Sequence, residues 1–456
     1  MVNAKQILLS GSTAKATRLR VITTAELAKE TPHMRQLASA QGFEAASGGL
    51  LALTRADGTI AQWLVGAPAP GADPFTLGAI SSKLPGGTYY YDPEPEQPEL
   101  VALGFALELY KYDPFRPLKV KDVQLVLPKT ANAQKLHREV DAAFLVRDLI
   151  NAPANLMGPD ELEDAAHTLA KAHGAKFTTV KGAKLAKEFP LIHIVGLASP
   201  RAPRLIDFTW GNQAHPKVTI VGKGVCFDTG GLDIKPSSGM LLMKKDMGGA
   251  ATVLGLAHLV MQAKLPLRLR VLIPAVENAI SGSAFRPGDV FKTRKGLTVE
   301  IGNTDAEGRL VLCEALALAD EEKPDLLIDM ATLTGAARVA LGPDLPPFYT
   351  DDTKLAMRLL HHAAVSNDPL WQLPLWKPYE AMIETPIADL NNAGQGGFAG
   401  SITAALFLKR FVEQAKSYVH FDIFGWTPTA KPGRPKGAEA QGLRAVFGVL
   451  AELAAK

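Results

Sequence analysis

The sequence predicts an α/β protein with a smaller N-terminal α/β domain and a larger C-terminal domain, whose mixed, mostly parallel sheet is flanked by helices. Three observations lead to this fold class. The chain has 456 residues, which is long for a single domain. Hydrophobic residues make up 47% and charged residues 21%, a globular balance with ample material for a core. From residue 160 onward, strand-like apolar runs alternate with helical patterns, as in sheets covered by helices.

The first domain is predicted over residues 1–130, and a helix over residues 131–150 joins it to the second domain. Its clearest signal is the pair Asp57-Gly58 between two apolar runs, which favours the tight turn of a β-hairpin. Apolar residues at helical spacing predict the connecting helix, and the proline and asparagine residues of NAPANLMGP end it. Before that helix, the predicted elements are a hairpin over 50–65, a helix over 100–110 and a strand over 123–127.

The second domain is predicted over residues 151–456 and continues the alternation of strands and helices. Strands are predicted at 177–180, 192–195, 205–210, 218–221, 268–273, 297–301, 326–330 and 418–423. Helices are predicted at 160–173, 249–262, 309–320, 354–364 and 402–414. In open α/β sheets ligands bind outside the carboxyl ends of the strands, so we expect the chemistry in the loops that follow these strands.

Composition and charge exclude several classes of protein. The 49 lysines and arginines nearly balance 46 aspartates and glutamates, so the net charge of +3 gives no reason to expect a nucleic-acid or membrane-surface partner. No run approaches the roughly 18 apolar residues of a membrane span. Two cysteines, Cys226 and Cys313, are too few for a disulfide framework or a thiolate zinc site. We therefore expect a cytoplasmic protein with no membrane attachment.

Three loops concentrate charged residues and glycine. They are GKGVCFDTGGLDIKPSSGM (222–240), which follows the strand KVTIV, then KKDMGGAA (244–251) and GNTDAEGRL (302–310). Taken singly, Asp246 could cap a helix and Asp228 could be a turn residue. Asp305 and Glu307, however, lie two residues apart and would repel each other unless a cation neutralises them. Carboxylates are hard oxygen ligands that suit Zn²⁺, Mn²⁺ or Mg²⁺, so the three loops together predict a divalent metal site.

Other kinds of site fit the sequence poorly. Phe227 stands where a dinucleotide-binding loop needs glycine, and Gly224 stands where a Walker loop needs serine or threonine. The sequence contains no HExxH, and AGSIT (399–403) departs from the G-x-S-x-G elbow of serine hydrolases. Neither cysteine has an identifiable base near it, so both are interpreted as buried thiols.

The octapeptide NTDAEGRL (303–310) resembles the signature of the leucyl (cytosol) aminopeptidase family. Further segments resemble that family: VGKGVCFDTGG (221–231), KPS (235–237), MKKDMGGAA (243–251), ENAISGSAFRPGDV (277–290), DMATLTGA (329–336) and GSITAALFLKRF (400–411). The resemblance extends over about residues 147–456, and residues 1–130 show no comparable motif. It implies a metal-dependent aminopeptidase that hydrolyses the N-terminal peptide bond of peptides through a water bridging two divalent metals.

The resemblance also implies a role for each matching side chain. The metal ligands would be Lys223, Asp228, Asp246, Asp305 and Glu307. Asp228 and Glu307 would bridge the two ions, which are Zn²⁺ or Mn²⁺ with Mg²⁺ as an alternative. Lys235 would stay protonated and stabilise the developing oxyanion. Arg309 has the planar fork that suits a small planar anion, and the family's anion is a bicarbonate that acts as general base.

Specificity and assembly follow from the same resemblance. Four residues match the family's pocket for the first side chain: Met243, Thr332, Gly335 and Phe424. Each of them could equally be part of the core. Phe424 lies in DIFGW, where the family usually has DIAG, so we expect a shift from leucine toward smaller or differently shaped residues. The family forms hexamers, so we expect a homohexamer acting on peptides.

Two other functions stay open at this point. One is a scaffold that keeps the fold and binds nucleic acid, which the nearly neutral charge does not favour. The other is a dipeptidase specialised for a substrate such as cysteinylglycine. The sequence does not determine the preferred N-terminal residue, the native metal pair or the fold of the N-terminal domain.

Overall fold

The computed structural model describes residues 3–116 and 122–455 and divides into two compact units. The first unit comprises Met1–Phe144 together with Thr429–Lys436, and the second comprises Leu145–Pro428 and Gly437–Lys456. The chain passes from one unit to the other within helix α5 (Ala133–Asn151), which includes the segment predicted as a connecting helix. A short segment near the C-terminus thus belongs to the first unit although its neighbours in sequence belong to the second.

The first unit contains a six-stranded sheet in the order β1-β6-β5-β2-β4-β3. Its strands are β1 (Leu8–Leu9), β2 (Thr17–Ile22), β3 (Leu50–Thr54), β4 (Ile60–Gly66), β5 (Gly87–Tyr91) and β6 (Val123–Val126). All neighbours are parallel except β3 and β4, which form the hairpin predicted at Asp57-Gly58. Gly58 has a φ of +81°, as such a turn requires. The helices of this unit are α1 (Ala4–Ile7), α2 (Thr24–Lys29), α3 (Pro32–Ala40) and α4 (Pro98–Glu108).

The second unit is built on a nine-stranded sheet in the order β16-β15-β18-β14-β9-β11-β8-β7, with β10 paired to β11. Its strands are β7 (Lys176–Lys181), β8 (Arg204–Trp210), β9 (Lys217–Gly222), β10 (Gly224–Asp228), β11 (Arg268–Asn278), β14 (Leu326–Ala331), β15 (Pro347–Tyr349), β16 (Trp371–Gln372) and β18 (Tyr418–Asp422). The central strands β18, β14, β9 and β11 are parallel and almost wholly buried, which explains why most of their residues are apolar.

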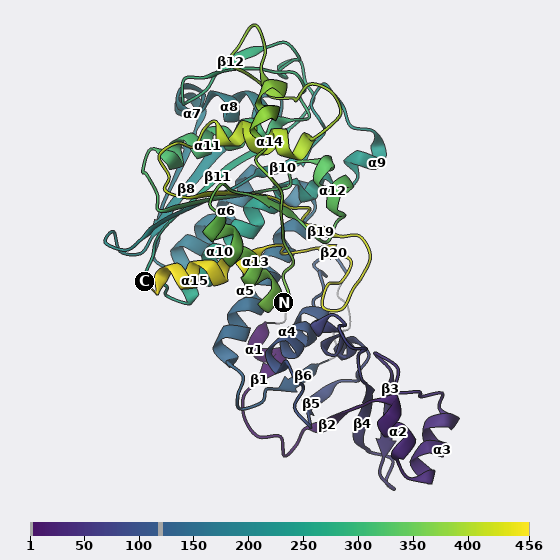
Figure 1. Ribbon diagram of the computed structural model, residues 1–456. Helices are drawn as coiled ribbons and strands as arrows, with labels where there is room; N and C mark the ends of the chain where they lie inside the picture. Colours follow the sequence, from purple (N-terminus) through teal and green to yellow (C-terminus); the bar gives the residue numbers. More distant parts are fainter. Residues whose placement is uncertain (1–2, 117–121, 456) are drawn as a thin grey trace. The chain divides into compact units, whose positions relative to one another are not determined.

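Helices cover both faces of this sheet (Figure 1). One face carries α6 (Pro159–Ala172), α10 (Gly248–Gln262), α13 (Thr353–Val365) and α15 (Leu443–Ala454). The other carries α7 (Gly182–Glu188), α8 (Pro190–Gly196), α11 (Glu307–Asp320) and α14 (Gly400–Lys409). A mixed, mostly parallel sheet between two helical layers, next to a smaller α/β unit, confirms the predicted fold class.

Shorter elements complete the second unit. A three-stranded sheet contains β12 (Val290–Lys292), β13 (Thr298–Glu300) and β17 (Leu390–Asn391), and β19 (Trp426–Thr427) pairs with β20 (Gly437–Ala438). The short helices are α9 (Ser237–Met240) and α12 (Gly335–Leu341). Over both units, 3-10 turns lie at Pro74–Thr76, Gly78–Ser82, Ala154–Leu156, Met243–Met247 and Lys377–Ile383. No helix in the described part of the chain is long and apolar enough to cross a membrane.

Two predictions for the second unit were wrong. The run predicted as a strand at 192–195 is part of helix α8, with Pro190 at the first helical turn. A short apolar run does not distinguish a strand from a buried helix, and α8 packs against α11 and β11. Within the predicted loop 222–240, residues Gly224–Asp228 form strand β10, which pairs in parallel with β11. The helix predicted at 402–414 is α14, and it ends at Lys409.

Candidate active site

The five predicted metal ligands come together beside the carboxyl ends of the central strands. Lys223 directly follows β9, and Asp228 is the last residue of β10. Asp246 lies in the 3-10 turn that leads into α10, while Glu307 is the first residue of α11. Asp305 lies in the loop just before that helix. Loops after parallel strands and helix N-termini meet at this edge of a sheet, which is where α/β proteins form their sites.

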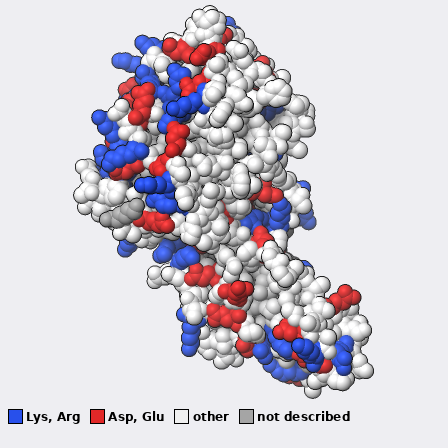
Figure 2. All heavy atoms as spheres, in the orientation of Figure 1, with Lys and Arg blue, Asp and Glu red and all other residues white. Residues whose placement is uncertain are grey.

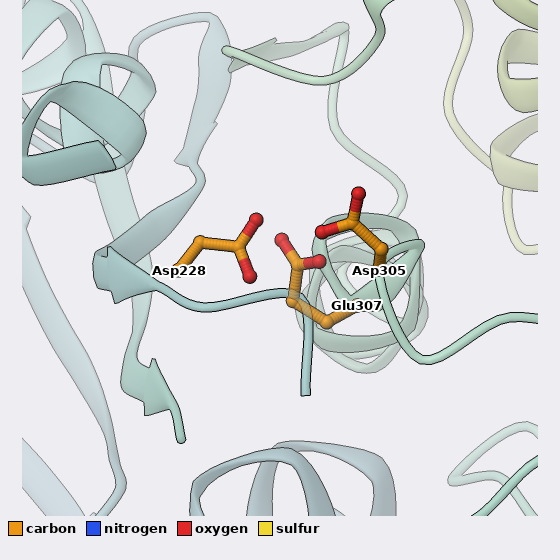
Figure 3. Close-up of side chains that lie close together, drawn as sticks. All are labelled: Asp228, Asp305 and Glu307. Atoms are coloured by element: carbon orange, nitrogen blue, oxygen red, sulfur yellow. The ribbon is translucent and has the colours of Figure 1, made fainter. Parts of the chain in front are cut away.

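Three carboxylates of this group point toward one another (Figure 3). Asp228, Asp305 and Glu307 each offer one oxygen atom, and these oxygens all lie within 4.8 Å of one another. Asp228 and Glu307 are buried, with 2% and 1% of their surface exposed. Oε2 of Glu307 has no hydrogen-bond partner among the described residues, although it is buried. A buried carboxylate oxygen without a partner in such a cluster suits a divalent cation.

Two lysines neutralise part of the negative charge. Nζ of Lys223 lies 2.8 Å from Oδ2 of Asp246 and 2.9 Å from Oε1 of Glu307. Nζ of Lys235 lies 2.7 Å from Oδ2 of Asp228 and also contacts Asp305. Four carboxylates and two ammonium groups would still leave an excess of negative charge, because each ammonium compensates only one carboxylate.

The pKa values reflect this excess of charge. Burial, followed by the charge of Asp228, raises the pKa of Glu307 to about 8. The same two causes raise the pKa of Asp305 to about 6. Burial alone would lower the pKa of Lys223, but the carboxylates around it, chiefly Asp246 and Glu307, together hold it above its ordinary value. Without added cations the site therefore favours protons on its carboxylates, and a divalent ion would replace those protons.

Glycines and neutral polar residues hold the carboxylates in place. The N–H of Gly230 and Nδ2 of Asn278 both donate to Oδ1 of Asp228, each at 2.9 Å. Gly230 has a φ of +89°, and a Cβ there would lie 2.6 Å from the carbonyl oxygen of Asp233. Nδ2 of Asn278 also donates to the carbonyl of Thr304, which joins this loop to the signature loop. Asn278 is neutral and lies far from the signature in sequence, so no charge pattern pointed to it.

Glycine is also required near the other two predicted ligands, Lys223 and Asp246, because other atoms approach the backbone closely there. A Cβ on Gly308 would lie 2.7 Å from Nζ of Lys223, so the glycine of the signature leaves room for this lysine. A Cβ on Gly249 would lie 2.0 Å from the carbonyl oxygen of Met330, which allows α10 to pack against β14. Oγ1 of Thr332 donates to the backbone carbonyl and to Oδ1 of Asp246, both at 2.9 Å. Thr332 therefore orients a carboxylate of the site.

Arg309 is a buried cation for which the described residues supply no partner. It lies in the first turn of α11 and is 8% exposed. Its Nε has no hydrogen-bond partner, and its guanidinium forms no ion pair with any described residue. Burial lowers its pKa to about 10, which leaves it charged at neutral pH. An unpaired planar cation beside the carboxylates is suited to binding a small planar anion.

The residues predicted as a pocket lie on several elements around Asp246. Gly335 begins α12, and Met243 begins the 3-10 turn that contains Asp246. Phe424 is half-buried, and its ring contacts two cations, Lys245 and Arg338, that sequence reasoning missed. No sequence signal identified this contact, because it joins three distant segments.

Comparison with known proteins identifies the family. Residues 144–447 match the catalytic domain of the cytosol aminopeptidase family, and residues 20–128 match the N-terminal domain of M17 aminopeptidases. The first match covers well over half of the chain. The chain belongs to the cytosol aminopeptidase family. The resemblance drawn from NTDAEGRL is thereby confirmed, and the match extends to an N-terminal region in which no motif had been recognised.

Relatives within the cytosol aminopeptidase family are similar over most of this chain. A probable cytosol aminopeptidase of Roseiflexus castenholzii is 44% identical over 312 residues, which are 67% of this chain and 64% of that protein. Another from Syntrophotalea carbinolica is 36% identical over 392 residues, or 82% of this chain and 78% of that one. The chain thus spans just under two thirds of the length of the first of these relatives.

Solved structures of the family superpose on nearly the whole chain. The crystal structure of the cytosol aminopeptidase from Coxiella burnetii has a TM-score of 0.93 and 44% identity, covering 98% of this chain and 99% of that one. The bottromycin maturation enzyme BotP, in complex with Mn, has a TM-score of 0.87 and 31% identity, covering 97% and 100%. The fold of both units is therefore that of the cytosol aminopeptidase family.

We expect metal to stabilise the chain through Glu307. Adding Mn²⁺ to chelator-treated protein should raise its melting temperature, because a ligand that binds only the folded state stabilises it. Glu307→Gln should lose most of that rise, since it removes a charged ligand oxygen. The matched control is Glu314→Gln on the same helix, where burial also raises the pKa to about 8 and a carboxylate oxygen accepts from the N–H of Arg294. An equal rise in both variants would contradict the assignment of Glu307.

Proposed function

We propose that the chain is a metal-dependent aminopeptidase that hydrolyses the N-terminal peptide bond of peptides. The observation that carries the proposal is the cluster of Asp228, Asp305 and Glu307, with an unpartnered oxygen on the buried Glu307, in a chain of the cytosol aminopeptidase family. Two divalent ions would supply a water of lowered pKa and an electrophile for the scissile carbonyl. Their ligands would be Lys223, Asp228, Asp246, Asp305 and Glu307.

The two lysines of the site would perform opposite tasks. Lys223 can bind a metal only as a neutral amine, so it must lose its proton to the solvent when an ion binds. Its burial, at 2% exposed, favours that neutral form once the charge of the carboxylates is compensated. Lys235 is more accessible, with 14% of its side chain exposed. It would keep its proton and donate to the carbonyl oxygen of the substrate as negative charge develops there.

Arg309 would hold the general base. Its guanidinium is buried and has no partner among the described residues, so a bicarbonate ion could take both of its parallel N–H groups. That ion would supply the general base for the attacking water, so no side chain of the chain would be needed as a general base. One of the two divalent ions would also bind the free α-amine of the substrate, which explains cleavage at the N-terminus.

The assembly, compartment and metal are proposed on the family's pattern. We infer a cytoplasmic homohexamer that uses Zn²⁺ or Mn²⁺, and the Mn complex of BotP supports the latter ion. In the face shown in Figure 2, basic and acidic side chains are intermixed and the region over α14 carries few charges. That view gives no support to a nucleic-acid scaffold.

Light scattering of the metal-loaded protein should give six times the mass of the chain, and a stable, active monomer would contradict the hexamer.

The proposed activity requires a free N-terminus on the substrate. The Mn²⁺-loaded protein should release the first residue of a short peptide, as seen by mass spectrometry, and should leave the N-acetylated form of the same peptide intact. Acetylation converts the free amine, which a metal ion would bind, into an amide whose nitrogen is a poor ligand. Cleavage of both peptides, or of neither with Mn²⁺ or Zn²⁺ present, would contradict an aminopeptidase.

Lys235→Ala separates catalysis from metal binding. Because Lys235 would stabilise charge and would not bind a metal, the variant should lose about 10²–10³ in kcat while its metal content stays that of the wild type. Steady-state kinetics and elemental analysis of the same preparation measure both quantities. If metal content falls together with kcat, the roles of the two lysines are assigned wrongly.

A further inference from the structure

Two cations contact the ring of Phe424 beside the candidate active site. Nζ of Lys245 lies 4.9 Å from the centre of the ring, and Cζ of Arg338 lies 4.6 Å from it. The face of an aromatic ring attracts a cation, but the ring does not neutralise the charge of that cation. The ring of Phe424 is therefore in contact with two positively charged side chains, Lys245 and Arg338.

Neither cation forms an ion pair with an acidic residue among residues 3–116 and 122–455. Lys245 is 2% exposed, and within the described residues its ammonium forms no hydrogen bond and no ion pair. Arg338 donates to the backbone carbonyl of Thr334 at 3.3 Å and forms no ion pair in the described part of the chain. A buried charge without a counter-ion is costly. Such a charge is retained most readily where a ligand supplies the missing anion.

The cations lie next to the site where the substrate's first residue would bind. Lys245 immediately precedes Asp246, one of the proposed metal ligands. A Cβ on Gly335, a residue of the predicted pocket, would lie 3.6 Å from a terminal nitrogen of Arg338, so that nitrogen lies beside the start of α12. A side chain that extends from the first residue of a bound peptide would therefore come close to both cations.

We propose that Lys245 and Arg338 form a subsite for a carboxylate, so that the enzyme prefers peptides that begin with glutamate or aspartate. This inference rests on the proposed aminopeptidase function. Arg338 has the planar fork that matches a carboxylate, and Lys245 adds a compact charge. Peptides that begin with lysine or arginine would be rejected by like charge. The subsite replaces the expectation, drawn from Phe424 alone, that the pocket selects by size.

The test compares glutamyl and glutaminyl arylamides, which have nearly the same shape and differ in charge. The wild type should show kcat/KM for the glutamyl substrate about tenfold or more above that for the glutaminyl one, equivalent to about 1.4 kcal/mol. Lys245→Met and Arg338→Gln should each lower this ratio severalfold. The matched control is Lys244→Met, because Lys244 donates to the carbonyl of Asn151 at 2.6 Å and lies by Trp426. Its ratio should equal that of the wild type.

A second measurement tests the subsite even if one of the variants folds poorly. Free glutamate should inhibit the wild type more strongly than free glutamine, and Arg338→Gln, at a partly exposed position, should remove the difference. A wild-type ratio at or below one, or a ratio that neither variant changes, would overturn the subsite. Turnover of leucyl or glutaminyl substrates without an acidic preference would overturn only the subsite. Absence of turnover for every substrate would instead contradict the proposed function.

Discussion

The repulsion among the carboxylates of Asp228, Asp246, Asp305 and Glu307 is the constraint on which the rest of the site depends. These groups come from three loops, and the fold buries Asp228, Asp246 and Glu307 where water screens their charges poorly, while Asp305 remains partly exposed. Protons, the two lysines or divalent ions must compensate their charge. The raised pKa of Glu307 and the ion pairs of Lys223 and Lys235 are two expressions of that single requirement.

The parallel sheet makes this arrangement possible at little cost elsewhere. Most side chains of its buried central strands are apolar, and the proposed metal ligands lie at or beyond the carboxyl ends of these strands. Close packing then requires glycine at a few positions, such as Gly249 against β14 and Gly308 against Lys223. The neutral partners Asn278 and Thr332 orient the carboxylates without adding further charge. The proposed metal site and the proposed carboxylate subsite around Phe424 would thus share one scaffold, and the subsite would change specificity alone.

Long periodic patterns could be predicted from the sequence, and contacts between distant segments could not. Helices α10 and α11 and the hairpin at Gly58 have strong local signals, and the acidic loops show their chemistry through like charges at close spacing. Helix α8 was mistaken for a strand because its apolar run is short, and β10 was missed because it is short and glycines lie on both sides of it. The hydrogen bond from Asn278 to Asp228 and the contact between Lys245 and Phe424 form only when the chain folds. Which of these side chains bind metal is inferred from the family's pattern.

The central claim is that five side chains of the second unit hold two divalent ions. Native mass spectrometry of the chain titrated with Mn²⁺ tests it most directly, because it counts bound ions without any substrate. The wild type should bind two ions per chain, and Lys223→Met should bind one tightly, because in the proposed site Lys223 would be a ligand of only one of the two ions. A wild type that saturates with one ion, or a Lys223→Met variant that binds two as tightly as the wild type, would contradict the claim.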